Sequence, residues 1–110
     1  MTCIFCSIAD GDIPASLAFE SEHVVAFHDI NAQAPVHIVV IPRAHYANMG
    51  ELTAADASLA GELMGVAASL GSAHHGGFRL VANTGPDGGQ SVDHVHVHVL
   101  AGRGLGWPPG

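Results

Sequence analysis

Three histidines alternate with three valines in residues 93–100. Strict alternation with β-branched residues predicts a half-buried strand in which His94, His96 and His98 share one face and the valines point into a core. At about 3.3 Å of rise per residue, the outer two Cβ atoms lie about 13 Å apart, whereas zinc lies about 2 Å from each ligating nitrogen. One ion therefore cannot take all three imidazoles, which must either divide their work or bind nothing.

A glycine-rich loop, Gly88-Gly89-Gln90-Ser91, leads into the histidines. Glycine lets a backbone approach a ligand closely, and successive N–H groups can point at a phosphate. Neutral imidazole is a competent nucleophile near pH 7, because its ordinary pKa is about 6.5. We interpret the loop and the histidines as a phosphate cradle that faces a nucleophile. The alternatives are an ordinary turn and the solvated polar face of an edge strand.

Both cysteines stand in Cys3-Ile4-Phe5-Cys6. Such close spacing cannot form the disulfide framework of a secreted domain, which leaves a metal half-site, a redox pair or inert thiols. The redox interpretation is weaker, because no strand precedes the motif as in a thioredoxin-like unit. Zinc would need two further ligands from distant histidines. The candidates are His23, His28, His37, His45, His74, His75 and the three alternating histidines.

The charge balance is acidic, with ten Asp and Glu residues against three arginines and no lysine, and the net charge is −7 with neutral histidine. A nucleic-acid-binding surface needs a basic stripe, so this class of partner is excluded, while a small phosphorylated ligand remains possible. Neither a leader peptide nor an apolar run of membrane-spanning length is evident. We expect one domain over residues 1–110, located in the cytoplasm, with no membrane partner.

Consecutive strands and one long helix would support these groups. A short helix and three strands are predicted, in order, over residues 4–10, 23–27, 36–41 and 78–82. The strand over 36–41 is nearly all apolar, which predicts a central position. Thr53 and Asp56 resemble an N-cap pair, and apolar residues follow at helical spacing up to Gly71, so we predict a helix of about 17 residues. These elements indicate an α+β fold on a mainly antiparallel sheet.

The alternating histidines and the loop before them resemble the signature of the histidine triad (HIT) superfamily. Similar segments extend along nearly the whole chain, at residues 3–6, 12–15, 26–30, 34–37, 41–45, 87–91 and 107–110. The terminal Trp-Pro-Pro-Gly is similar to the Hint branch, the histidine triad nucleotide-binding proteins. The resemblance implies a HIT-like fold with a five-stranded sheet, one long helix and one short helix. It also implies a homodimer in which two sheets join into one of ten strands.

The implied activity is that of a purine nucleoside phosphoramidase, which cleaves AMP or GMP from an amine. His96 would attack the phosphorus and form a nucleotidyl-histidine, with His98 at the phosphate, Ser91 relaying a proton to the amine and His37 orienting His96. The other implied substrate-binding residues are Asn83, Gly89 and Gln90 at the phosphate, Asp29 at the ribose, Phe5, Ile8, Phe27, His28 and Ile30 around the base, and Trp107 from a tail near the partner's site.

Family members with Cys-x-x-Cys at this position bind one structural zinc, which catalysis does not require. The resemblance implies four ligands here, namely Cys3, Cys6, His45 and His94. Three other functions stay open. They are a dinucleoside polyphosphate hydrolase of the same superfamily, a catalytically vestigial nucleotide-binding or scaffold protein, and a metal buffer that uses the nine histidines.

Overall fold

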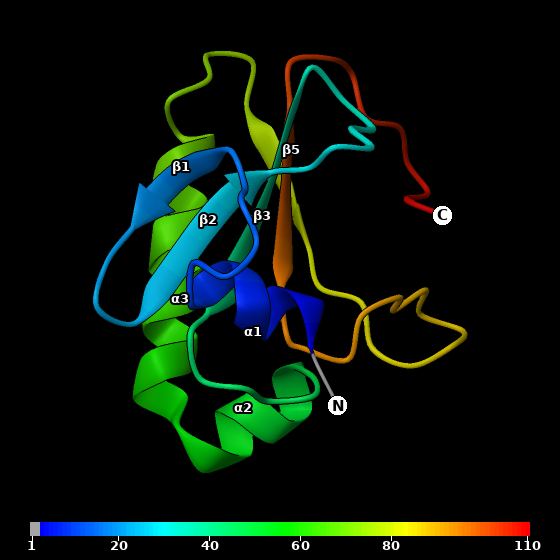
Figure 1. Ribbon diagram of the computed structural model, residues 1–110. Helices are drawn as coiled ribbons and strands as arrows, with labels where there is room; N and C mark the ends of the chain where they lie inside the picture. Colours follow the sequence, from blue (N-terminus) through cyan, green and yellow to red (C-terminus); the bar gives the residue numbers. More distant parts are fainter. Residues whose placement is uncertain (1–2) are drawn as a thin grey trace.

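The structure is a computed structural model that describes residues 3–110, and its centre is a five-stranded sheet with strand order β1-β2-β3-β5-β4 (Figure 1). Every neighbouring pair of strands is antiparallel. In chain order, the elements are α1 (Ile4–Ala9), β1 (Leu17–Glu20), β2 (Val24–His28), β3 (Val36–Pro42), α2 (Met49–Ala55), α3 (Ala57–Gly71), β4 (Phe78–Val81) and β5 (Val97–Ala101). The predicted α+β fold on a five-stranded antiparallel sheet is confirmed.

The sheet has a core on each face, because the central strands alternate buried side chains between two layers. Ile38 and Val40 of β3 pack in the larger core with α2 and α3, whereas Val39 and Ile41 pack in the smaller core beneath α1. Figure 1 shows α3 behind the sheet and α1 in front of it. β3 is central and buried along almost its whole length, as its apolar sequence predicts.

The valines of the alternating segment point into the core, as predicted. Val95, Val97 and Val99 are all buried in the larger core with α3. The histidines therefore project from the opposite face of the sheet, where the Phe5 ring of α1 packs against His96 at 5.1 Å between ring centroids. The segment thus places its chemistry on the α1 side of the sheet.

The extent of the last strand differs from the prediction over residues 93–100. β5 begins only at Val97, and both His94 and His96 precede it. β5 pairs with β3 only as far as Val40, and two residues further along β3 lies Pro42, which has no N–H to continue a ladder. The Val95 N–H instead donates to the Tyr46 carbonyl at 2.7 Å. His94 and His96 are 0% and 5% exposed, so this part of the predicted half-buried strand has no solvent-exposed histidine face.

The predicted long helix is confirmed as α3, but its expected start is wrong. Asp56 is the N-cap, and its side chain accepts a hydrogen bond from the Leu59 N–H at 3.0 Å. Thr53 lies inside α2, a second short helix that the apolar spacing did not reveal. Its N-cap is Asn48, which accepts from the Glu51 N–H at 2.9 Å. β1 also went unpredicted, because its four residues lack a clear alternation.

Within residues 3–110, no helix is both long and apolar enough to span a membrane.

Candidate functional site

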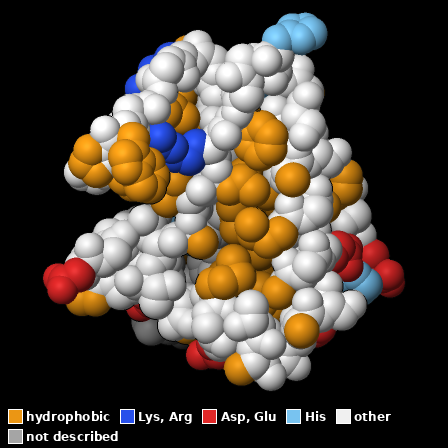
Figure 2. All heavy atoms as spheres, turned by 180° about the vertical axis from the view of Figure 1, so that it is seen from behind, with side chains coloured by type: hydrophobic (Ala, Val, Ile, Leu, Met, Phe, Trp, Pro, Cys, Tyr) orange, Lys and Arg blue, Asp and Glu red, His pale blue; other side chains and the backbone are white. Residues whose placement is uncertain are grey.

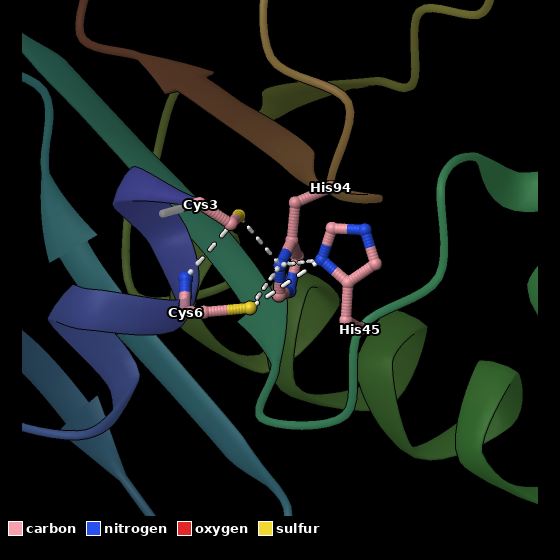
Figure 3. A group of neighbouring side chains, drawn as sticks. All are labelled: Cys3, Cys6, His45 and His94. Atoms are coloured by element: carbon pink, nitrogen blue, oxygen red, sulfur yellow. Dashed lines mark hydrogen bonds between the residues drawn. The ribbon is translucent and has the colours of Figure 1, made fainter. Parts of the chain in front are cut away.

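Four sulfur and nitrogen side chains from three distant segments meet at one point (Figure 3). Cys3 and Cys6 come from the start of α1, His45 from the loop after β3, and His94 from the segment that leads into β5. His94 Nδ1 lies 3.4 Å from Cys3 Sγ and 3.5 Å from Cys6 Sγ. His45 Nδ1 lies 3.4 Å from Cys6 Sγ and 3.2 Å from His94 Nδ1. We call these four residues the Cys/His cluster.

The spacing of these atoms fits a tetrahedral metal ion. Zinc with bonds of about 2.3 Å to sulfur and about 2.0 Å to nitrogen holds a sulfur and a nitrogen about 3.5 Å apart, and two nitrogens about 3.3 Å apart. The observed separations of 3.4, 3.4 and 3.5 Å for sulfur and nitrogen, and 3.2 Å for the two nitrogens, agree with this geometry. Two thiols and two imidazoles are also the soft donor set that zinc prefers.

The protonation of His94 suits a metal ligand. His94 Nε2 lies 2.9 Å from the Pro42 carbonyl oxygen, which can only accept, so Nε2 carries the proton and Nδ1 presents a lone pair to the cluster. Burial lowers the pKa of His94, chiefly through desolvation, and keeps the ring neutral. Burial and the neighbouring Cys3 raise the pKa of the Cys6 thiol, so a cation is needed to hold the thiolate that a metal site uses.

A second group, which we call the Asp/His chain, consists of Asp29, His37 and His98. His37 Nε2 lies 2.9 Å from His98 Nδ1 and 3.4 Å from Asp29 Oδ2. On its other side, His37 Nδ1 accepts a hydrogen bond from the Gln33 N–H at 3.0 Å. A neutral imidazole has one donor nitrogen, so Nε2 of His37 carries the proton and donates it to His98 Nδ1. The proton of His98 therefore resides on Nε2.

His98 is kept in the neutral form, in addition to being fixed in one tautomer. Desolvation by burial, followed by the nearby His96 and His37, lowers the pKa of His98 to about 4, against a smaller raising effect of Asp29. Near neutral pH, this side chain is an uncharged N–H donor.

His96 has the opposite arrangement, with a free lone pair on its outer nitrogen. Its Nδ1 lies 2.8 Å from the His94 carbonyl oxygen, so Nδ1 carries the proton and Nε2 is unprotonated. Its ring lies at 4.9 Å between centroids from that of His98 and meets Phe5 edge to face. His37 is hydrogen-bonded to His98, so the predicted orienting effect of His37 on His96 would act through that neighbour.

The residues predicted to hold the phosphate lie in and around one compact turn. The Asn83 side chain donates to the Gly88 carbonyl at 2.6 Å, and Gln90 donates to the Ala47 carbonyl at 2.6 Å. A Cβ at Gly88 would clash with the Thr84 backbone, and Gly89 has a φ of 79°, so the turn requires glycine. The Ser91 side chain is exposed and lines a cavity of about 780 Å³ that also reaches Cys3 and His45.

The predicted base-binding residues are only partly brought together. Phe5 and Phe27 pack edge to face at 5.4 Å between centroids, with Ile8 against the same core. His28 is exposed, and the Ile30 and Trp107 side chains are 104% and 84% exposed, so these three do not close a pocket within one chain. A residue that sequence reasoning missed is Gln33, whose backbone N–H sets the tautomer of His37. A backbone contact of this kind leaves no signal in the sequence.

All three arginines are engaged with backbone carbonyls. Arg43 donates to the carbonyls of Ala9 and Ser21, and Arg79 to those of Leu105 and Gly106. Arg103 donates through Nε and Nη2 to the Gln33 carbonyl, at 3.1 and 3.0 Å. The chain has no lysine, so these three arginines are its only Lys or Arg side chains.

The protein is thus a small α+β domain. Its Cys/His cluster has the spacing of a metal site, and the neighbouring rings of His96 and His98 are each held in one tautomer. The chain belongs to the HIT domain family, which it matches over residues 10–105. It is 47% identical to an uncharacterized HIT-like protein of Synechococcus elongatus, over 97% of this chain and 96% of that protein.

Two solved structures extend the likeness. A HIT family hydrolase from Legionella pneumophila is 42% identical, with a TM-score of 0.94 over 99% of this chain and 100% of its own. A histidine triad nucleotide-binding protein from Candida albicans is 29% identical, with a TM-score of 0.82 over 97% of this chain and 83% of its own.

Proposed function

We propose that this protein is a hydrolase that cleaves the P–N bond of purine nucleoside 5′-phosphoramidates through a covalent nucleotidyl-histidine on His96. The observation that carries the proposal is the pair of tautomers on neighbouring rings. His96 presents a lone pair on Nε2, whereas His98 presents an N–H on Nε2. A nucleophile beside a neutral hydrogen-bond donor is suited to attack on a phosphorus whose oxygens need a partner.

In the first step, Nε2 of His96 attacks the phosphorus while the bond from phosphorus to the amine nitrogen breaks. The leaving amine must gain a proton, and the exposed hydroxyl of Ser91 is placed in the proposal as the relay. In the second step, water attacks the phosphorus, the bond to His96 breaks, and the nucleoside monophosphate leaves.

Phosphate binding is assigned to neutral donors. His98 and Asn83, with the backbone of Gly89 and Gln90, would hold the phosphate oxygens. The pKa of His98 at about 4 supports a neutral donor near pH 7, and the engagement of every arginine in carbonyl contacts supports the same conclusion. Asp29 would bind the ribose hydroxyls through its carboxylate.

The base would lie over the apolar surface of α1 and β2. Phe5, Ile8 and Phe27 form its floor in the proposal, and the packing of both phenyl rings in one cluster supports this assignment. His28 at the end of β2 and Ile30 in the loop that follows would cover the base, since both side chains are exposed and free to contact a ligand.

We assign the Cys/His cluster to one structural zinc, because its donor atoms already have tetrahedral spacing. Cys3, Cys6, His45 and His94 would hold the ion, which would tie the start of α1 to the sheet and take no part in the reaction. The thiols must stay reduced to serve as ligands, which supports a cytoplasmic location.

We further propose a homodimer in which two sheets join at β4. β4 is an edge strand, and an exposed edge pairs readily with another strand. Phe78 on β4 and Met64 on α3 are 38% and 40% exposed, and Figure 2 shows a band of hydrophobic side chains on this rear side of the molecule. Sedimentation equilibrium should give the mass of two 11.2 kDa chains, and the mass of one chain would contradict the dimer.

Turnover of an adenosine 5′-phosphoramidate tests the activity. We expect His96→Ala to lower kcat/KM by about 10⁴-fold, because the covalent route is lost. The same variant should keep its zinc, since the His96 ring is no part of the Cys/His cluster. Unchanged turnover in His96→Ala would exclude it as the nucleophile.

The second candidate is a dinucleoside polyphosphate hydrolase of the same family. Competition between a phosphoramidate and diadenosine polyphosphates in one reaction compares the two substrate classes directly. Strong preference for the polyphosphates would replace the phosphoramidase assignment, and absence of turnover on either class would leave a nucleotide-binding protein.

A further inference from the structure

The loop between β2 and β3 is held by hydrogen bonds that run from one residue to the next. The Asn31 N–H donates to Asp29 Oδ1 at 2.8 Å, and the Gln33 side chain donates to the Asn31 carbonyl at 2.9 Å. The Gln33 N–H then donates to His37 Nδ1 at 3.0 Å. The loop therefore has one defined shape, and that shape places an amide proton behind His37.

Arg103 secures this loop from a distant part of the chain. It follows β5 and reaches back over 70 positions to place both Nε and Nη2 on the Gln33 carbonyl oxygen, at 3.1 and 3.0 Å. Its Nη1 donates to the Gly104 carbonyl at 2.8 Å, which fixes the guanidinium itself. Hydrogen bonds from a charged group are stronger than those between neutral groups. Gln33 is thus held on both sides, by Arg103 at its carbonyl and by His37 at its amide.

The Gln33 amide on Nδ1 of His37, together with the Asp29 carboxylate 3.4 Å from Nε2, sets which nitrogen of His98 carries a proton. With the Gln33 N–H on Nδ1, His37 must donate from Nε2, so His98 Nδ1 accepts and its Nε2 is a donor. Without that amide, His37 could carry its proton on Nδ1. His98 would then have to donate to His37, and its Nε2 would turn a lone pair toward the site.

We propose that Arg103 is a positioning residue that, through Gln33 and His37, keeps His98 in the tautomer with its proton on Nε2. The consequence for turnover rests on the proposed function, because an Nε2 proton matters there as a donor to the phosphate. The effect on the tautomer does not depend on it. The tail of the chain is thereby linked to the reacting group, although Arg103 itself is exposed and its hydrogen bonds go to Gln33 and Gly104 rather than to either histidine.

Arg79 provides a matched control. It also holds the tail through two hydrogen bonds to carbonyls, those of Leu105 and Gly106, yet it makes no hydrogen bond to Gln33. Arg79→Met and Arg103→Met therefore remove the same charge and a similar anchor, while only the second releases the loop. Arg103→Lys retains one charged donor for the Gln33 carbonyl and serves as the conservative variant.

The experiment is ¹⁵N NMR of the histidine rings in the substrate-free, zinc-loaded protein, with His37 and His98 assigned by their Gln variants. Wild type, Arg79→Met and Arg103→Lys should show the proton on Nε2 of both rings. Arg103→Met should show a mixed population with protonated Nδ1 on His37, and kcat/KM about tenfold below wild type. Zinc content and the amide spectrum report whether each variant is folded.

Unchanged ring tautomers in folded Arg103→Met would overturn the proposal, as would the same change in Arg79→Met. Should Arg103→Met not fold, Arg103→Leu, which also lacks a donor for the Gln33 carbonyl, is subject to the same criterion. Failure of the proposed function alone would give a different result. The ring tautomers would still change in Arg103→Met, but no variant, wild type included, would turn over a phosphoramidate.

Discussion

The Cys/His cluster and the Asp/His chain contain similar ligand types, and the side chains of each lie close enough together to suggest a metal site. Their distances separate them. The nitrogens of His45 and His94 are 3.2 Å apart, which suits two ligands of one ion, whereas those of His37 and His98 are 2.9 Å apart, the length of a hydrogen bond. The first group has the spacing of ligands around one ion, and the second has the spacing of a hydrogen-bonded chain.

The cause of this difference lies behind the rings, in the backbone. The Pro42 carbonyl accepts a hydrogen bond from Nε2 of His94, which leaves Nδ1 of that ring unprotonated and facing the Cys/His cluster. The Gln33 amide donates a hydrogen bond to Nδ1 of His37, which leaves Nε2 of that ring as the donor. His96 resembles His94 in this respect. The His94 carbonyl accepts a hydrogen bond from Nδ1 of His96, which leaves a lone pair on Nε2. The backbone groups behind the rings therefore give the imidazoles different tautomers, which match the proposed roles of ligand, nucleophile and donor.

Cys3→Ser should separate the two groups most strongly. The variant should bind no zinc, against one ion per wild-type chain, and should lose about 4 kcal/mol of unfolding free energy, the gain expected when free metal exceeds its Kd about 1,000-fold. Turnover should fall by less than about tenfold, because no step uses the ion. Elemental analysis and urea unfolding measure the effects. Several ions per chain, or zinc retained by Cys3→Ser, would favour a metal buffer.

His37→Phe should have the reverse effect on the two groups. The ring that fixes His98 is lost, so we expect kcat/KM to fall about 100-fold, or about 2.7 kcal/mol of transition-state stabilisation. Zinc content should stay at one ion per chain, because His37 is no part of the Cys/His cluster. Steady-state kinetics and elemental analysis on one preparation provide both values. Zinc loss in this variant would show that the two groups are not separable.

A smaller effect is expected in the pH dependence of stability. The pKa of His98 is about 4 in the folded chain, and its ordinary value is 6.5. Between these values the unfolded chain binds more protons, so the free energy of unfolding should fall as the pH drops from about 6.5 to about 4. The full shift corresponds to at most about 3 kcal/mol, and because His98 is only partly buried we expect about 1 kcal/mol.

Urea unfolding of wild type and His98→Gln across this pH range measures the contribution of His98. Other pH-dependent changes are common to both proteins, so only the difference between the two profiles reports on His98. His96, His37 and Asp29 surround the ring, and the first two lower its pKa while Asp29 raises it. Parallel pH profiles in the two proteins would contradict the lowered pKa.

Much of the fold was predictable from local patterns. The alternation of valine and histidine correctly directed Val95, Val97 and Val99 into the core, and the apolar run around Val39 indicated the central strand. The helix boundaries were predicted less accurately, because the apolar spacing was followed and the N-cap residue Asn48 of α2 was not recognised. Its side-chain bond to Glu51 is local, so a capping motif was available in the sequence.

The sequence by itself determined which residue types are present and on which face of the sheet they stand, because alternation of side chains follows from backbone geometry alone. Only the tertiary structure decided their protonation and their partners. Cys6 and His45 are 39 positions apart and His37 and His98 are 61 apart, so their meeting depends on chain packing. Whether a carbonyl or an amide lies behind each ring depends on that packing too, and this contact separates a metal ligand from a proton donor.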